Sequence, residues 1–459
     1  MIIPLLCSLY YGESEIKIWV ICFAVCLVTG HLLSWHLPKR KAFYAKEGFV
    51  TVALGWITMS LFGTIPFMMS GYIPNFFDAL FEIVSGFTTT GASILNDVEA
   101  LPNSLLMWRS LSHWIGGMGV LVFLMAILPL SGGGNLHLLR AESPGPAVNK
   151  LVPKAKSTAM ILYSIYICFT AVEIVLLLLG GLNIFEALTL SFGTAGTGGF
   201  AILNSSCASY SPYIQYVIAI FMILFGVDFG LYHILLFREA KSSLLKSDEL
   251  KGYIGIITAA VVVIFINCYH LFSTVEEAFR HILFTVGSIM TTTGYCTVDF
   301  NVWPEFSKTI LVLLMFIGAC SGSTGGGIKV SRIIILLKTI VKEIRTCAHP
   351  RTTLKIKANG RIVEHETIRG INVYVVSYAS IFIISLLIIS IDNFSFTTNF
   401  TAIAATINNI GPGLEMVGPT GNYSAFSNLS KAVMSFCMLA GRLEIFPMLI
   451  LFSPYTWRK

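Results

Sequence analysis

The sequence has 459 residues, of which 55% are hydrophobic and 12% are charged, and its mean hydropathy is +0.78. A soluble domain carries about 25% charged residues, so this composition excludes a soluble globular protein and indicates a membrane protein with many spans. The formal net charge of +6 does not indicate nucleic-acid binding, because the basic residues lie between apolar segments. The ten cysteines lie mostly inside apolar segments and form no metal-binding pattern.

The first two apolar segments predict an N-terminal helix pair over residues 1–48. Residues 1–10 cover only half of the ~20 residues that a membrane span needs, and we expect them to be the end of a first helix that starts before them. Ile18–Leu37 is long enough for a complete span.

One pattern then repeats four times: an apolar span, an apolar segment too short to cross a bilayer, a Thr/Gly-rich motif, and a second apolar span. The four short segments have 8–16 residues, fewer than the ~20 that a span needs, which is the length of a re-entrant element. The short segments are Phe77–Phe87, Ile184–Phe192, Val275–Met290 and Phe400–Ile407. We therefore expect an all-α polytopic membrane protein with four pore repeats around one central pore, at 49–157, 158–252, 253–369 and 370–459.

The distribution of basic residues gives the expected topology. With ten crossings, five segments that hold 22 of the 30 Lys and Arg residues fall on one side, which the positive-inside rule makes cytoplasmic. These segments are Lys39–Lys46, Arg140–Lys156, Arg238–Lys251, Lys338–Arg369 and Arg458–Lys459. All four Thr/Gly motifs then lie on the outer side, and the C-terminus is cytoplasmic.

The Thr/Gly motifs have the composition of a cation filter. A dehydrated cation needs carbonyl oxygens in place of its water shell, and a glycine allows the positive φ that turns the chain back. The C-terminal end of each preceding short helix would direct its negative dipole end at the pore. The expected K⁺ ligands, mainly through backbone carbonyls, are Thr89, Thr90, Gly91, Thr194, Ala195, Gly196, Thr292, Thr293, Gly294, Asn409, Ile410 and Gly411. Cys207 and Cys296 follow two of these motifs, and a contact between them is left open.

The stretch Gly318–Lys329 interrupts the second span of the third repeat. Its glycines, serines and threonine are poor residues for a helix interior, and an unwound backbone is tolerated at membrane depth only inside protein or beside a wet cavity. We expect this to be the only broken second span and to form a gate under the filter. The expected gate residues are Gly318, Gly322, Gly325, Gly326, Gly327, Lys329 and Arg442.

Charged residues inside the spans are candidates for functional sites. Arg442 is expected to hold the loop's carbonyls or to pair with an acid, as a gate element or as a structural clamp. Arg109 and His113 have the spacing of ordinary helix packing residues. Asp78, Glu82 and Glu277 either attract cations to the pore mouth or are ordinary solvated charges. The linker segment Lys355–Val363 alternates around Asn359-Gly360, which is a type I′ hairpin signal; it is either a plain solvated loop or a docking surface.

On these motifs the chain resembles the TrkH/KtrB family of bacterial potassium uptake subunits, and TrkH more than KtrB because of the N-terminal helix pair. His113-Trp-Ile-Gly-Gly-Met-Gly119 and the ending Gly441-Arg442-Leu-Glu444 add to the resemblance. It implies K⁺ uptake across the bacterial cytoplasmic membrane, a homodimer, a TrkA-like nucleotide-binding partner subunit, and a constriction made by the broken loop and Arg442. K⁺ would be the transported ion, with no organic cofactor bound by this chain.

Two other classes of function compete with a channel-like pore. A secondary transporter of a cation or small solute, coupled to Na⁺ or H⁺, is the main alternative, although such carriers tend to have inverted repeats. An enzyme is disfavoured, because the chain contains no H-E-x-x-H or G-x-S-x-G motif and no complete phosphate-binding loop.

Overall fold

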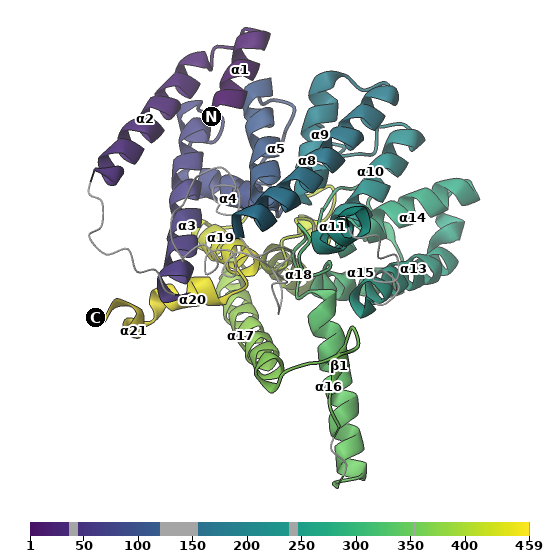
Figure 1. Ribbon diagram of the computed structural model, residues 1–459. Helices are drawn as coiled ribbons and strands as arrows, with labels where there is room; N and C mark the ends of the chain where they lie inside the picture. Colours follow the sequence, from purple (N-terminus) through teal and green to yellow (C-terminus); the bar gives the residue numbers. More distant parts are fainter. Residues whose placement is uncertain (36–44, 120–154, 238–246, 352–353, 459) are drawn as a thin grey trace.

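The computed structural model describes residues 1–35, 45–119, 155–237, 247–351 and 354–458, and these residues are mostly helical (Figure 1). The first half contains α1 (Ile2–Tyr11), α2 (Ile16–Ser34), α3 (Ala45–Met69), α4 (Phe76–Phe87), α5 (Asn103–Gly117), α8 (Ala155–Leu179), α9 (Ile184–Gly196), α10 (Pro212–Phe225) and α11 (Phe229–Phe237). The second half contains α13 (Asp248–Cys268), α14 (Val275–Met290), α15 (Glu305–Ile317), α16 (Val330–Ala348), α17 (His365–Ile389), α18 (Phe396–Ile407), α19 (Asn428–Arg442), α20 (Phe446–Phe452) and α21 (Pro454–Trp457). Short 3₁₀ turns lie at Tyr269–Leu271, Phe300–Val302, Ser390–Asp392 and Glu415–Val417. The prediction of an all-α membrane fold is confirmed.

Four short helices, α4, α9, α14 and α18, lie among the longer ones. Each begins at a residue whose side chain accepts a hydrogen bond from the first turn, which satisfies backbone N–H groups that have no partner within the helix. These N-cap residues are Asn75, Asn183, Thr274 and Ser395. The short helices therefore have starting points fixed by local sequence.

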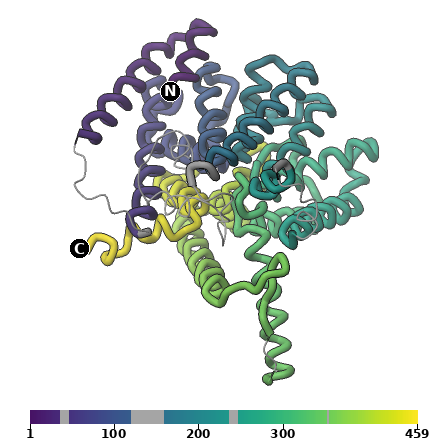
Figure 2. The backbone as a smooth tube through the Cα atoms, in the orientation of Figure 1, coloured from purple at the N-terminus to yellow at the C-terminus, as the bar shows by residue number. Residues whose placement is uncertain are grey.

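The packing of the short helices closes the fold into a ring. We call each short helix, with the long helix before it and the helices that follow it, a helical set. Helix α9 contacts α10 of its own set and α5 of the set before it. In the same way α14 contacts α15 and α10, and α18 contacts α19 and α15. Helix α4 contacts α5 and α19, so the last set returns to the first. Figure 2 shows the C-terminal yellow segment beside the purple segment of α3, and α20 contacts α3. The repeat boundaries that we expected stay predictions.

Five described helices are long and apolar enough to cross a membrane, and a sixth candidate is the bent pair α10 and α11. The five are Ile16–Ser34, Lys46–Met69, Ala159–Leu179, Asp248–Leu271 and His365–Asp392. They correspond to α2 and to the first helix of each helical set. The count of ten crossings stays a prediction, since the second helices are interrupted and residues 120–154 lie outside the described part.

The expectation of a single broken second span is wrong. Helices α10 and α11 meet at 91° across residues 226–228, and α19 and α20 are separated by residues 443–445. Leu443 has φ and ψ of −91° and 15°, while Glu444 and Ile445 have positive φ. Neither break has a glycine-rich run. At the first, a neighbouring segment supplies a hydrogen bond, from the Cys320 N–H to the Gly226 carbonyl at 3.0 Å. At the second, the backbone bonds are local, as when the Ile445 N–H donates to the Ala440 carbonyl at 2.7 Å.

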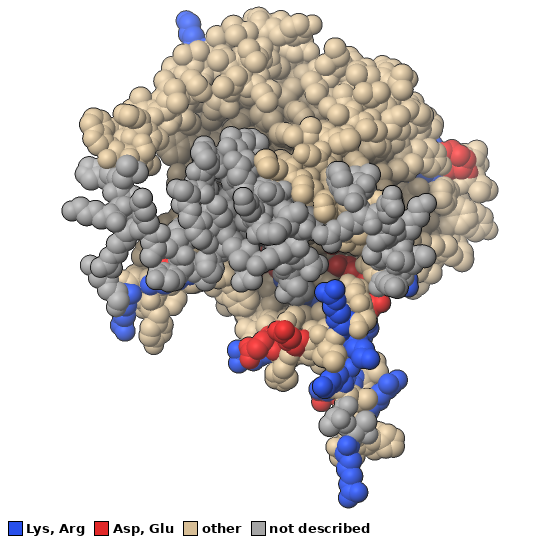
Figure 3. Space-filling model, viewed as in Figure 1, with Lys and Arg blue, Asp and Glu red and all other residues tan. Residues whose placement is uncertain are grey.

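The hairpin prediction in the linker is confirmed. Strands β1 (Lys357–Ala358) and β2 (Arg361–Ile362) pair antiparallel, with Ala358 opposite Arg361. Asn359 and Gly360 have φ of 52° and 76°, as a type I′ turn requires. The hairpin lies beside α16, which extends away from the rest of the molecule (Figure 1). Lys and Arg side chains gather on this extension (Figure 3).

Candidate ion-conduction site

The segments that follow the four short helices share one backbone conformation. The turn residues Thr89, Thr197, Thr292 and Asn409 have φ between 54° and 58°. Two residues later, Gly91, Gly199, Gly294 and Gly411 again have positive φ, between 79° and 98°. The residue between them donates its N–H to a carbonyl five residues earlier in every case, at 2.8–2.9 Å; these donors are Thr90, Gly198, Thr293 and Ile410. This bond ties each segment to the C-terminal end of its helix.

The four segments meet in a closed ring. A Cβ atom added to Gly91 would lie 2.0 Å from the carbonyl oxygen of Gly198, and one added to Gly199 would lie 2.1 Å from that of Thr293. A Cβ on Gly294 would lie 2.1 Å from the Ile410 oxygen, closing the series toward the fourth segment. The ring returns to its start at Gly411, where a Cβ would lie 2.7 Å from the oxygen of Thr90. Since these distances exclude a side chain, each glycine is required by the approach of its neighbour as well as by its φ.

The ring corrects the predicted ligands of the second repeat. Thr194, Ala195 and Gly196 form the last turn of α9, and Thr197, Gly198 and Gly199 occupy the places equivalent to Thr89, Thr90 and Gly91. The predicted register of that motif is therefore wrong by three residues. It followed the first Gly of Gly196-Thr-Gly-Gly199, and the pattern Thr/Asn-x-Gly, common to all four turns, does not decide between the two, because both Thr194-Ala-Gly196 and Thr197-Gly-Gly199 match it.

In the other three repeats the predicted residues lie in the ring segments. Thr88 and Thr90 pair their hydroxyl groups at 2.8 Å, and Thr291 and Thr293 form the same pair at 2.8 Å. The fourth segment is attached differently, because the Asn409 side-chain amide donates to the Thr90 hydroxyl at 3.0 Å. These hydroxyl and amide groups hold the segments, while the Thr89 Oγ1 and the Asn409 Oδ1 have no hydrogen-bond partner in the described part of the chain.

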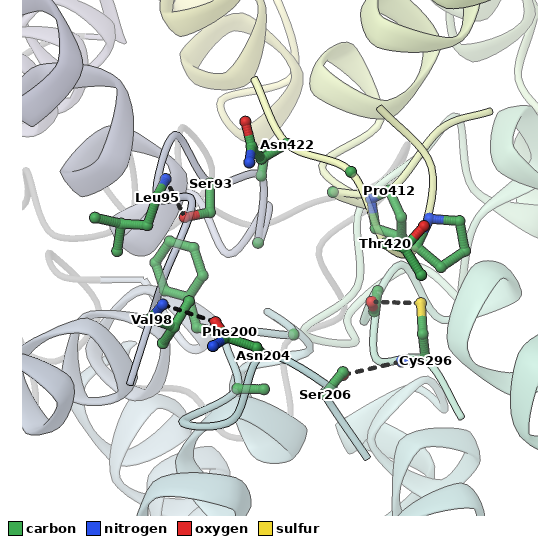
Figure 4. Close-up of a pocket in the computed structure, with 18 of the residues that line it drawn as sticks. Ser93, Leu95, Val98, Phe200, Asn204, Ser206, Cys296, Pro412, Thr420 and Asn422 are labelled. Carbon is green, nitrogen blue, oxygen red and sulfur yellow. Dashed lines mark hydrogen bonds between the residues drawn. The ribbon is translucent and has the colours of Figure 1, made fainter. Parts of the chain in front are cut away.

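A cavity of about 190 Å³ lies on one side of the ring (Figure 4). Its lining includes all four ring glycines: Gly91, Gly199, Gly294 and Gly411. Asn204 lies at its edge, where its amide donates to Asp97 at 2.7 Å and lowers the pKa of that carboxyl. Cys296 also lines the cavity and accepts a hydrogen bond from the Cys207 N–H at 2.9 Å through its backbone, so the two cysteines meet, with both thiols free.

The interrupted segment between α15 and α16 lies directly against the ring segments. The Gly326 N–H donates to the Thr292 hydroxyl at 2.6 Å, and a Cβ on Gly326 would lie 2.3 Å from the Asn408 oxygen. The two ends of this loop touch, because a Cβ on Gly327 would lie 2.6 Å from the Cα of Gly318. The loop therefore closes on itself, and its glycines permit contacts that no side chain would allow.

The predicted gate residues all belong to this loop except Arg442, which contacts it. Arg442 donates to the Thr324 carbonyl at 2.7 Å and to the Gly117 carbonyl at 2.6 Å, so it links the loop to the end of α5. Lys329 is 1% exposed, has φ of 82°, and donates from its ammonium group to the Gly325 carbonyl. Gly322 lies at the side of the loop that faces Asp228, and its carbonyl accepts from the Phe229 N–H at 3.1 Å.

The family model for TrkH, described as a cation transport protein, matches residues 16–458. The chain belongs to the TrkH family. It is 36% identical to the Trk system potassium uptake protein TrkH of Escherichia coli (strain K12) and 34% identical to that of Halomonas elongata, over 100% of this chain and 96% of each relative. The crystal structure of the potassium transporter TrkH from Vibrio parahaemolyticus superposes with a TM-score of 0.88 at 31% identity, covering 100% of this chain and 96% of that one. The predicted resemblance to TrkH is confirmed.

A fully buried ion pair and a partly buried one lie beside the site in this TrkH-family chain. Arg109 and Glu82 are 2% and 0% exposed and pair at 2.8 Å, so Glu82 is neither a solvated charge nor a free charge at the mouth. Arg109 also donates to the Ala201 carbonyl at 3.2 Å, which connects the first ring segment's helix to the second segment. Arg332 of α16 pairs with Glu444 beyond the end of α19. Sequence reasoning missed both partnerships, because the partners lie far apart in the chain.

Proposed function

We propose that this chain takes up K⁺ through a channel-like pore whose filter is the ring of four segments. The observation that carries the proposal is the closed contact of Gly91, Gly199, Gly294 and Gly411 with their neighbours' carbonyls. A ring of backbone carbonyls can replace the water shell of a cation. The relatives named above are potassium uptake proteins and potassium transporters, which supports K⁺ as the ion.

The proposed ligands are the carbonyls of the two ring residues in each segment. They are Thr90, Gly91, Gly198, Gly199, Thr293, Gly294, Ile410 and Gly411. The four short helices end immediately before these segments. The C-terminal end of a helix carries a partial negative charge, so four such ends around one point favour a cation and disfavour an anion.

The loop Gly318–Lys329 is proposed as the gate beneath this filter, with Arg442 holding it closed. The support is contact: the loop bonds to Thr292 of one ring segment, and Arg442 bonds both to Thr324 of the loop and to Gly117 of α5. Opening then requires at least these hydrogen bonds to break. The guanidinium can hold several carbonyls at once, because it has five N–H donors in a fixed plane.

The membrane, the orientation and the partners of the chain are proposed from the distribution of its basic residues and from its family. The chain is placed in the bacterial cytoplasmic membrane with its C-terminus and the linker 338–369 inside, since most Lys and Arg residues lie in segments of that side. A homodimer and a TrkA-like nucleotide-binding subunit that opens the gate are proposed from the family resemblance. The basic extension of α16 (Figure 3) offers such a subunit an accessible surface.

Flux into liposomes tests the proposal. The purified chain is reconstituted, and uptake of radioactive Rb⁺ is measured with K⁺ or Na⁺ as competitors and with no imposed H⁺ or Na⁺ gradient. The pore predicts passive uptake that K⁺ competes more strongly than Na⁺. Uptake that requires an H⁺ or Na⁺ gradient supports the coupled transporter instead, and the absence of saturable or competed uptake contradicts both.

A further inference from the structure

The second ring segment lacks a side chain that two of the others have. In the first and third segments the residue before the ring glycine is a threonine, Thr90 or Thr293, whose hydroxyl pairs with the threonine two residues earlier. In the second segment this place is taken by Gly198. The φ of Gly198 is not positive, so its backbone conformation is one that any residue adopts and does not explain the glycine.

The side chain of His113 explains it. A Cβ added to Gly198 would lie 2.2 Å from the Cγ of His113 and 2.4 Å from its Nδ1, so the imidazole fills the space of a threonine side chain. His113 lies on α5, in the helical set before that of Gly198, and is 0% exposed. Gly198 and His113 are therefore mutually dependent. The imidazole fits only because residue 198 has no side chain, and without the imidazole a gap would remain beside Gly198.

Both nitrogens of His113 are used, each toward a different repeat. Nε2 lies 3.1 Å from the backbone nitrogen of Phe200, which can only donate, so Nε2 accepts and Nδ1 carries the proton. Nδ1 then donates to the Gly86 carbonyl at 2.7 Å, in the last turn of α4. The imidazole ring also lies 4.3 Å from the ring of Phe200. His113 thus connects the short helix of the first repeat to the ring segment of the second.

We propose that His113 is a positioning residue of the filter, which takes the place of the missing threonine at position 198 and sets selectivity for K⁺ over Na⁺. It acts on the ion through the position of the Gly198 and Gly199 carbonyls, because the adjacent Phe200 N–H is fixed by Nε2. The inference rests on the proposed function. It assigns to a histidine outside the four motifs the role that a filter threonine has in the first and third repeats.

A compensation experiment tests the proposal in reconstituted full-length protein. His113→Ala leaves a gap and an unpaired Phe200 N–H, and Gly198→Thr places its side chain on the imidazole, so each single variant is expected to lose selectivity. We expect the ratio of K⁺ to Na⁺ competition against Rb⁺ uptake to fall roughly tenfold, the factor given by one lost buried hydrogen bond. The double variant His113→Ala/Gly198→Thr removes the clash, so it is expected to recover the ratio to the level of His113→Ala and no further, because Gly196 stands in the place of Thr88 and the Phe200 N–H stays unpaired.

Two conservative variants keep the test decisive if the double variant does not fold. Gln can place an amide oxygen near the position of Nε2, and Asn can place an amide nitrogen near that of Nδ1. His113→Gln is therefore expected to retain more selectivity than His113→Asn, which leaves the Phe200 N–H unpaired. Because Gln is also closer to His in volume than Asn is, His113→Met serves as the packing control: it fills the space without accepting from the Phe200 N–H and is expected to lose selectivity. Equal ratios in His113→Gln and His113→Met would contradict the proposal.

The matched controls are His281→Ala, which removes a buried histidine that bonds to Thr297, and Gly55→Thr, where a Cβ meets nothing within 4 Å. Both are expected to keep the wild-type ratio. Selective flux in the wild type with unchanged ratios in all His113 variants overturns this inference alone. A wild type without competed flux overturns the proposed function itself.

Discussion

Arg442 and Thr324 are joined by a 2.7 Å hydrogen bond, although 118 residues separate them in the chain. The guanidinium of Arg442 comes from the last turn of α19, and the carbonyl of Thr324 lies in the middle of the loop between α15 and α16. The same side chain reaches the carbonyl of Gly117. The Arg442 side chain therefore connects three of the four helical sets below the ring, and its removal should loosen the loop.

Arg442→Ala should raise basal Rb⁺ uptake in the absence of any partner subunit. The variant loses the bonds to Thr324 and Gly117, and a hydrogen bond to a charged group contributes about 1.5–3 kcal/mol, which corresponds to a rise of roughly tenfold or more in the open population. The control is Arg369→Ala, whose exposed i,i+3 pair with Glu366 lies in the linker end of α17. Unchanged uptake both in Arg442→Ala and in a deletion of residues 321–326 would exclude the gate.

Glu249 should be a second attachment point of the same loop. Its carboxylate accepts from the Ser321 N–H at 2.7 Å and from the Ser331 N–H at 3.1 Å, at the start of α16. Glu249→Ala leaves both amides without this acceptor, so basal uptake should rise as it does in Arg442→Ala. Glu13→Ala is the matched control, because Glu13 also accepts a backbone N–H, that of Ser104, away from the loop. A rise of equal size in both variants would show a general loss of integrity instead.

Substitution of Gly199 by alanine should abolish uptake. A Cβ there would lie 2.1 Å from the Thr293 carbonyl oxygen, and the φ of 81° adds backbone strain. Gly181→Ala separates the two causes: its φ is 91°, but a Cβ meets nothing within 4 Å. It should reduce thermal stability slightly and leave uptake intact. Full uptake in Gly199→Ala would contradict the corrected register of the second segment.

The buried pair Arg109–Glu82 should matter for stability. Replacing one partner leaves the other charge buried without its counterion, which costs about 3–5 kcal/mol, so Glu82→Gln and Arg109→Met should both lower the melting temperature in detergent. The matched control is Glu305→Gln, since the Glu305 carboxylate pairs with Lys308 but is 88% exposed. An exposed pair contributes about 0–1 kcal/mol. The measurement is the fraction of protein that stays monodisperse after heating.

The sequence alone determined the order of helices and the place of the loop. Long and short apolar segments differ in whether they can cross a bilayer, and the short helices begin at capping residues that act locally, such as Asn75 and Asn183. The glycine-rich run 318–327 was identifiable because unwound backbone at membrane depth is rare. The Asn359-Gly360 turn was predictable because positive φ at two successive residues restricts which residues can occupy it.

Only the tertiary structure decided which residues of other segments these elements contact. The ring register of the second repeat depends on His113, which arrives from the preceding repeat and excludes a side chain at Gly198. The break at 226–228 is flanked by hydrogen bonds to Cys320 and Gly322 of another segment, so its own composition does not mark it. Likewise Glu82 had the sequence context of a solvated charge, and Arg109 makes it a buried one. Such contacts join residues distant in the chain, and local propensity and periodicity carry no information about them.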